Sequence, residues 1–240
     1  MDTMVLRLLG FLMLFPVGSL SADVSNNVGL GRYEDRARLK NDLFVQYDRT
    51  LEPNDEFGTI RVNHSISRAV LVSFENGVME VSFWNGMQWF DSRLVWDPSA
   101  YGNVSKLDIL RTDIWEPDFH VIESIEPYNG YPNPSIYATV QNNGHILLYP
   151  PESLKVACPY NEQDLYTNSE VLCTMKFSVW THTCREIEPH IESEDIETVY
   201  SLDHRWKVVS TKAVRNVLRN SCCPEIFCDV TYTFHLKRVA

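Results

Sequence analysis

Two neighbouring cysteines, Cys222 and Cys223, are the residues of this sequence whose types and spacing indicate the most specific chemistry. A disulfide between adjacent residues closes almost no loop, so it hardly restricts the unfolded chain and adds little to the stability of the fold. The same bridge strains the peptide bond between the two residues. Such a pair therefore suits the shaping of a loop better than the stapling of a domain.

Catalytic and metal-binding patterns give no comparable signal. The chain contains no Gly-x-Ser-x-Gly, no His-Glu-x-x-His, no phosphate-binding glycine loop and no dinucleotide fingerprint. A competing zinc site would use Cys222, Cys223, Cys228 and His235. Their spacing matches no common zinc pattern, and a secreted protein favours disulfides. We therefore expect no enzyme, no metal and no cofactor.

Residues 1–22 have the character of a secretory signal. An apolar run from Val5 to Val17 includes one charge, Arg7, and small residues follow it up to Ala22. The run is too short to cross a bilayer, and the small residues suit cleavage by signal peptidase. A buried helix is the alternative, which the polar residues that follow disfavour. We expect residues 23–240 to form one secreted domain without a membrane segment, because no other apolar run approaches the required length.

Composition and charge restrict the classes of partner. The formal net charge of −11 repels nucleic acid, so no nucleic-acid partner is expected. A hydrophobic content of 44% and an aromatic content of 12% provide ample material for a packed core. Two sequons, at Asn63 and Asn103, are compatible with glycosylation of an extracellular protein.

The elements that must position these residues are one helix and many short strands. Apolar side chains recur at helical spacing over residues 33–47, and Pro53 closes the connection that follows. Alternation and β-branched residues then predict strands at 70–74, 78–84, 136–140, 146–149, 174–180, 206–209 and 230–236. Turns are predicted at 75–77 and 142–144, where Asn-Gly pairs occur. This pattern favours a single β-sandwich domain.

Four motifs in order along the chain resemble those of the Cys-loop family, which includes the nicotinic acetylcholine receptors and the acetylcholine-binding proteins. They are Trp-Asn-Gly-Met-Gln-Trp at 84–89, Trp-Glu-Pro-Asp at 115–118, Ser-Val-Trp-Thr-His at 178–182 and Cys-Cys-Pro-Glu at 222–225. The resemblance extends from Tyr33 to Arg238. It implies an all-β, immunoglobulin-like sandwich of about ten strands behind an N-terminal α-helix. It also implies a homopentameric ring with a ligand site at each junction between subunits.

The family recognises quaternary ammonium ligands such as acetylcholine, which have no N–H to donate and are bound by charge and by aromatic ring faces. The resemblance assigns the principal face of the site to Trp180, Cys222, Cys223 and Phe227. It assigns the complementary face, from the neighbouring subunit, to Trp84, Thr139, Leu147 and Tyr149. The other tryptophans are expected to be structural: Trp89, Trp96, Trp115 and Trp206.

Three positions depart from the family's tyrosines, namely Ile122, Asn220 and Phe227. Phe227 keeps a ring without the hydroxyl, whereas Ile122 and Asn220 offer no aromatic face. At about 0.5–2 kcal/mol for each cation–π contact, the loss of two rings would weaken binding roughly 10- to 1,000-fold. We therefore expect weak binding of acetylcholine, or a preference for a less charged or larger ligand.

Six cysteines in an oxidising compartment suggest three disulfides, and the sequence alone allows fifteen pairings. The resemblance implies the family's signature bridge between Cys158 and Cys173, the adjacent pair described above, and a third bridge between Cys184 and Cys228 at the base of the capping loop. The polar interior of the 158–173 loop lacks the family's aromatic apex, which favours a soluble binding protein.

Two alternatives to a soluble binding protein stay open. One is the extracellular domain of a channel subunit, because residues 230–238 resemble the strand that leads into a membrane helix. The other is a structural homologue that has lost small-molecule binding, in line with the missing tyrosines.

Overall fold

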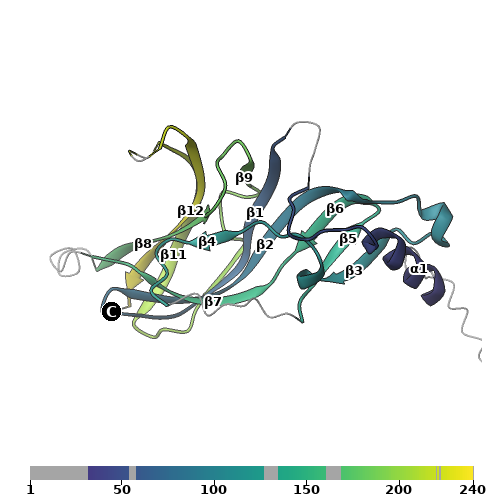
Figure 1. Ribbon diagram of the computed structural model, residues 1–240. Helices are drawn as coiled ribbons and strands as arrows, with labels where there is room; N and C mark the ends of the chain where they lie inside the picture. Colours follow the sequence, from purple (N-terminus) through teal and green to yellow (C-terminus); the bar gives the residue numbers. More distant parts are fainter. Residues whose placement is uncertain are drawn as a thin grey trace, which may run out of the picture.

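The protein is described from a computed structural model that covers residues 32–53, 58–126, 135–160, 169–219, 221 and 223–239. These residues form one α-helix, two short 3-10 helices and twelve strands arranged in two sheets. The helix α1 (Tyr33–Phe44) lies at one end of the elongated molecule, and the C-terminus lies at the other (Figure 1).

The larger sheet has eight strands in the order β10-β1-β2-β6-β5-β3, with β7 paired to β2 and β9 paired to β1. Its strands are β1 (Ile60–Glu75), β2 (Val78–Val95), β3 (Lys106–Leu110), β5 (Tyr137–Gln141), β6 (Asn143–Leu148), β7 (Pro151–Ala157), β9 (Ile187–Ile191) and β10 (Thr198–Ser201). The 3-10 helices η1 (Pro98–Tyr101) and η2 (Arg111–Asp113) flank β3. Strands β9 and β10 pair with β1 in parallel, whereas the other pairs in this sheet are antiparallel.

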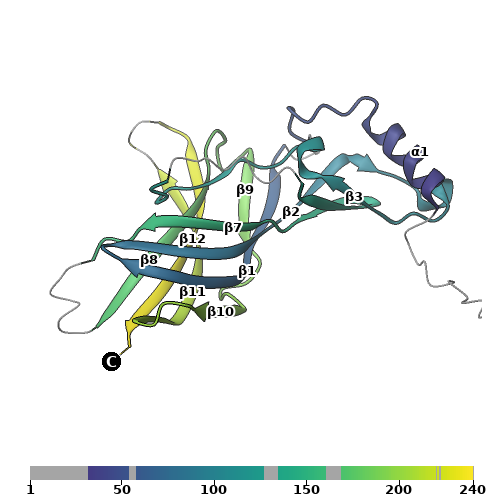
Figure 2. The same ribbon diagram turned by 90° about the horizontal axis from the view of Figure 1, so that it is seen from below.

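The smaller sheet is antiparallel and has the order β11-β12-β8-β4. Its strands are β4 (Phe119–Val121), β8 (Glu170–Val179), β11 (Trp206–Arg219) and β12 (Ile226–Arg238). Both views place α1 and β3 at the end of the molecule that β8, β11 and β12 do not reach (Figures 1 and 2). The expected β-sandwich behind an N-terminal helix is therefore confirmed, with twelve strands instead of about ten.

Four strands, β1, β2, β11 and β12, are much longer than the sequence pattern predicted, and the helix is shorter. β1 begins at Ile60 instead of residue 70, because its register with β2 and β9 continues through the polar residues Asn63 and His64 that interrupt the apolar alternation. α1 ends at Phe44 instead of residue 47. Tyr47 lies in the following turn, where its hydroxyl donates to Asp91 Oδ2 at 2.8 Å and accepts from the Trp115 N–H at 3.0 Å.

The turn predicted between the first two strands joins β1 to β2. Asn76 and Gly77 both have positive φ, 52° and 74°. This is the geometry of a type I′ hairpin turn, which Asn-Gly adopts readily because glycine has no Cβ to clash.

The core lies in two clusters. One fills the space between the two sheets with side chains such as Phe83, Phe177 and Phe234. The other lies toward α1 around Trp89, whose ring meets that of Trp115 edge-on with centroids 6.2 Å apart. All four tryptophans expected to be structural, Trp89, Trp96, Trp115 and Trp206, are buried, with 7% exposure or less.

Disulfides join Cys158 to Cys173 and Cys184 to Cys228. The first connects the end of β7 to β8, and the second connects the segment after β8 to β12. Cys223 is also disulfide-bonded. Its expected partner, Cys222, lies outside the described residues, so that pairing stays a prediction. The competing zinc site is excluded, because Cys228 cannot be a thiolate ligand while it is bonded to Cys184.

A histidine lies in the core between the sheets. His64 on β1 is fully buried, its ring is 4.4 Å from that of Phe177, and its Nδ1 is 3.0 Å from the hydroxyl of Tyr232 on β12. Burial disfavours the charged imidazolium and lowers the pKa of His64 to about 3.

We expect His64 to make the fold acid-sensitive. Below its unfolded pKa of about 6.5, His64 takes up a proton in the unfolded chain but not in the folded one, so the free energy of unfolding falls as the pH falls towards about 3. The loss is about 1.4 kcal/mol per pH unit, or roughly 2 kcal/mol between neutral pH and pH 5. Urea unfolding of the wild type and of His64→Gln at both pH values measures it.

The matched control for this prediction is Tyr232→Phe, which removes the hydroxyl but keeps the histidine. It should lower stability at both pH values and retain the wild-type difference between them. Burial raises the pKa of Glu116 and of Glu152, which acts in the opposite direction, and both glutamates are present in all three proteins. An unchanged difference in His64→Gln would show that His64 is not the source.

Candidate functional site

The exposed tryptophan at the end of β8 is held by the aspartate of the Trp-Glu-Pro-Asp motif. Trp180 is 70% exposed, and its backbone N–H donates to the carbonyl of Asp118 at 3.4 Å. The backbone N–H and the hydroxyl of Thr181 both donate to Asp118 Oδ2, at 3.1 and 2.7 Å. His182 is 3.3 Å from Asp118 Oδ1 and 3.2 Å from Glu52 Oε1. These bonds fix the segment that presents the indole.

A histidine, not Ile122, lies against Trp180. The ring of His120 on β4 packs edge-on to the indole with centroids 6.2 Å apart. Ile122 is 51% exposed and donates its N–H to the carbonyl of Lys176, four residues before Trp180. At about 3.3 Å per residue this separates it from Trp180 by about 13 Å along the strand. His120 was missed by the sequence motifs, although it precedes Ile122 by two residues and shares its face.

β12 brings Phe227 to the same end of the smaller sheet. Asp229 pairs with Ser178, so Phe227, two residues before Asp229, lies where β12 approaches Trp180, two residues after Ser178. Here β12 curls away from the body of the sandwich (Figure 1). Cys223 is half-buried, and Cys222 and Asn220 lie outside the described residues. We call Trp180, His120 and Phe227 the β8 group.

A second set of predicted residues lies on the solvent-facing side of the larger sheet. Trp84 on β2 is 45% exposed, and Gln88 is on the same side because side chains alternate along a strand. Between them, the ring of Tyr149 lies over Gly86. A Cβ at Gly86 would come within 2.6 Å of Tyr149 Cε1, so only glycine permits this approach.

The strand register adds the remaining two predicted residues to this surface. Leu147 on β6 lies opposite Gln88 on β2, and Thr139 on β5 lies opposite Leu147. The Thr139 hydroxyl donates to Asp108 Oδ1 on β3 at 2.8 Å. We call Trp84, Gln88, Leu147, Tyr149 and Thr139 the β2 group; its four predicted members come together on one surface.

Gln88 and Glu192 are members of this surface that the sequence motifs did not single out. The Gln88 side-chain amide donates to the Tyr149 hydroxyl at 2.7 Å and to Glu192 Oε1 at 2.9 Å. Burial, together with the nearby Glu192 carboxylate, raises the pKa of Tyr149. Gln88 could have been found from its position in the 84–89 motif, but Glu192 is more than 100 residues away and only the fold brings it here.

Behind His120 lies a cleft of about 240 Å³ that is lined by three acidic residues, Glu116, Asp118 and Glu152. Glu116 forms an ion pair with Arg111, and Glu152 accepts a hydrogen bond from the Asn85 amide at 3.0 Å. Burial raises the pKa of both glutamates. His120 lines this cleft and also contacts Trp180, so it lies between the cleft's glutamates and the β8 group.

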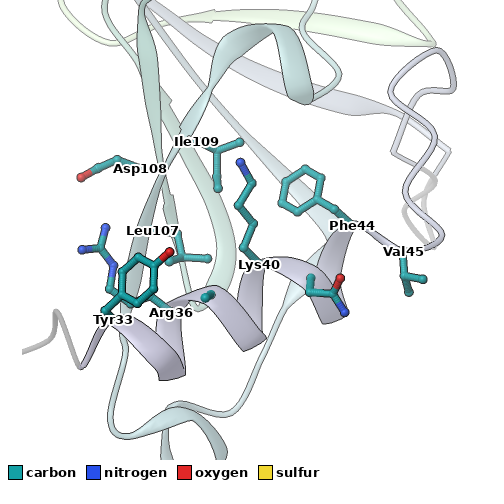
Figure 3. A pocket seen from close by; sticks show the side chains of 10 residues that line it. Tyr33, Arg36, Lys40, Phe44, Val45, Leu107, Asp108 and Ile109 are labelled. Atoms are coloured by element: carbon teal, nitrogen blue, oxygen red, sulfur yellow. The ribbon is translucent and has the colours of Figure 1, made fainter.

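A larger pocket of about 630 Å³ lies between α1 and β3 and contains none of the predicted site residues. Figure 3 shows Lys40 and Phe44 extending from α1 towards Ile109, with Tyr33 and Arg36 nearer the start of the helix. Asp108 lines the pocket and accepts a hydrogen bond from Thr139, so the pocket adjoins the β2 group.

The described residues provide neither a metal site nor a membrane helix. Among them, no three or more His, Cys, Asp or Glu side chains are placed to hold a metal ion. Within the same residues, no helix has the length and apolar character needed to cross a bilayer.

A helix-capped β-sandwich with a signature disulfide and two exposed tryptophans on different sheets defines a class of extracellular ligand-binding domain. Residues 36–240 match the family described as neurotransmitter-gated ion-channel ligand binding domain, and the chain belongs to this family.

Its relatives include receptor subunits from vertebrates and insects. The chain is 26% identical to the human neuronal acetylcholine receptor subunit alpha-5 over 92% of its own length and 47% of that protein. It is 26% identical to the rat alpha-6 subunit, over 84% of the chain and 41% of the relative. It is 27% identical to the fruit-fly (Drosophila melanogaster) acetylcholine receptor subunit beta-like 2, over 96% of the chain and 46% of that protein. The chain thus spans somewhat less than half of each of these relatives.

Proposed function

We propose that this chain is a secreted binding protein that assembles as a ring of five identical subunits and binds a small organic cation of the acetylcholine type between subunits, without channel activity. The observation that carries the proposal is the exposure of tryptophan. Trp84 and Trp180 are 45% and 70% exposed, whereas the other four tryptophans are buried. Large exposed aromatic side chains mark interaction sites, because burying them in a complex is favourable.

The site is completed by a second subunit. A cage for an ammonium ion needs several ring faces around one point, and the β8 and β2 groups belong to different sheets. If the β8 group of one subunit met the β2 group of the next, Trp180, Phe227 and His120 would face Trp84 and Tyr149. In a closed ring with head-to-tail interfaces, the β8 group and the β2 group of every subunit are both covered by a neighbouring subunit.

The affinity for acetylcholine is expected to be low. Ile122 supplies no ring, and because it lies opposite Lys176 of β8 it is too far from Trp180 to contact it. His120 supplies an imidazole next to Trp180. Imidazole is a weaker cation–π partner than phenol, and it becomes a repelling charge when protonated. A ligand with less positive charge or a larger apolar body therefore fits this site better.

Calorimetry combined with light scattering tests the proposal. The purified protein should have about five times the protomer mass and should release or absorb heat with acetylcholine or nicotine. The control ligand is 3,3-dimethylbutyl acetate, the neutral carbon isostere of acetylcholine, which should bind more weakly because it lacks the charge. A protein that is monomeric, or that binds neither amine, would contradict the proposal.

A second candidate is the extracellular domain of a channel subunit. It is favoured by the relatives, which are receptor subunits about twice as long as this chain. A transcript that continues past residue 240 into apolar segments of about 20 residues would support it.

N-terminal sequencing of the secreted protein tests the proposed signal-peptide boundary, since a chain that starts at Asp23 indicates removal of residues 1–22.

A further inference from the structure

The pocket between α1 and β3, which we call the α1 pocket, has the size and the apolar lining of a small-molecule site. Its volume of about 630 Å³ lies within the range of about 300–1,000 Å³ that is usual for ligand pockets. Leu107 and Ile109 line it from β3 and are buried, so the strand side is apolar. Phe44 adds a half-buried ring from α1. A hydrocarbon chain or ring in this pocket would be removed from water, which is favourable.

The two ends of the α1 pocket carry the most exposed large apolar side chains of the described residues. Tyr33, at the start of α1, is 81% exposed, and Val45, directly after the last residue of the helix, is 73% exposed. Both line the pocket, and Figure 3 shows them at opposite ends of it. A single exposed apolar side chain is ordinary, but two that border one cavity are typical of a surface that a ligand covers.

Arg36 brings a cation without a counter-ion to the α1 pocket. It lines the pocket from the helix and is half-buried. Arg32 and Arg38 do not line the pocket, and both pair with Asp35 at 3.5 Å. Arg36 has no such ion pair within the described part of the chain. A guanidinium in this position suits a carboxylate, which can accept two parallel N–H bonds from it.

The acids nearby make contacts of their own. Lys40 Nζ is 3.4 Å from Asp113 Oδ2, and this pair is exposed to solvent. Asp108 lines the pocket, but its carboxylate accepts a hydrogen bond from Thr139 at 2.8 Å, and Figure 3 shows it turned away from Lys40. Arg36 therefore remains as the charge that a ligand would neutralise, whereas an ammonium ligand would be repelled by Arg36 and Lys40.

We propose that the α1 pocket binds a small amphipathic carboxylate, that is, a carboxylate attached to an apolar chain or ring. The carboxylate accepts hydrogen bonds from Arg36, and the apolar part covers Leu107 and Phe44 between Tyr33 and Val45. Both halves of the ligand are needed. A neutral chain leaves the guanidinium without a partner, and a short carboxylate such as acetate leaves the apolar lining in water. This site shares no residue with the β8 or β2 group, so its failure would leave the proposed amine site standing.

Calorimetry of the purified protein with decanoate tests the site, with decanol as the neutral control and acetate as the short one. Decanoate should bind about 10-fold more tightly than decanol, and acetate should give no measurable heat. Arg36→Gln should weaken decanoate binding about 10-fold and leave decanol binding unchanged. Ala37→Phe places a ring in the pocket from the exposed side of α1 and should weaken the binding of both.

Two further variants make the comparison specific. Arg32→Gln removes an arginine beside the pocket that does not line it, and Trp180→Ala removes the indole of the amine site. Both should bind decanoate like the wild type, and urea unfolding verifies that every variant is folded. The assignment is overturned by a lack of decanoate binding, by equal affinity for decanoate and decanol, or by unchanged affinity in Arg36→Gln or Ala37→Phe. Loss of decanoate binding in Trp180→Ala would place the acid at the amine site and would overturn it as well.

Discussion

Replacement of Arg93 by methionine should lower the free energy of unfolding by about 3 kcal/mol, one of the two largest effects that we expect. The reason is Asp91, whose side chain is fully buried on β2. Arg93 donates to both of its carboxylate oxygens, at 2.9 Å from Nε and 2.8 Å from Nη2. Without the guanidinium, the carboxylate would be left buried with Tyr47 as its remaining side-chain donor among these contacts.

The same arginine also fixes the segment after α1. Its Nη1 donates to the carbonyls of Asp48 and Leu51, at 3.0 and 2.9 Å, and its guanidinium lies 4.4 Å from the centre of the Tyr47 ring. Loss of these contacts adds to the destabilisation. Chemical unfolding of the purified protein at neutral pH measures the effect.

Two variants give this prediction its controls. Asp91→Asn combined with Arg93→Met removes the buried charge along with its partner, and should recover part of the lost stability. Arg61→Met removes an arginine that is 77% exposed and 3.6 Å from Glu188, and should cost less than about 1 kcal/mol. An Arg93→Met protein as stable as Arg61→Met would show that the Asp91–Arg93 pair does not stabilise the fold.

Replacement of Trp180 by alanine should weaken the binding of a cationic amine by about 2 kcal/mol, or roughly 30-fold. Trp180 is the most exposed of the tryptophans, at 70%, so its removal should hardly change the stability of the subunit. The loss should therefore appear in calorimetry with acetylcholine or nicotine and not in the unfolding curve.

Ring-retaining and distant substitutions distinguish a binding role from a general surface effect. Trp180→Phe keeps an aromatic face and should recover part of the affinity. Tyr200→Ala removes another exposed ring, 54% exposed on β10 and outside both groups, and should bind like the wild type. Unchanged affinity in Trp180→Ala would refute the proposed site.

The sequence predicted the helix, the sandwich and the structural tryptophans because these depend on local patterns. Apolar periodicity starts α1 at Tyr33, and the Asn-Gly pair places the turn between β1 and β2. It did not predict the full length of β1. Asn63 and His64 are polar, and only pairing with β2 and β9 keeps them in the strand.

The candidate site divides in the same way. Motif order identified Trp84 and Trp180, because each lies in a distinctive run of neighbours. It did not identify His120 as the neighbour of Trp180, or Glu192 as the partner of Gln88, since these contacts join strands far apart in the chain.

By itself, the sequence determined the fold class and the family, because hydrophobic periodicity, turn residues and short motifs are properties of neighbouring residues. Only the tertiary structure decided which polar residues are buried, as with His64 and Asp91, and which distant residues meet, as with Gln88 and Glu192. Burial and cross-strand register arise from contacts between distant segments, and the pairing of strands that creates them is not recorded in any local pattern.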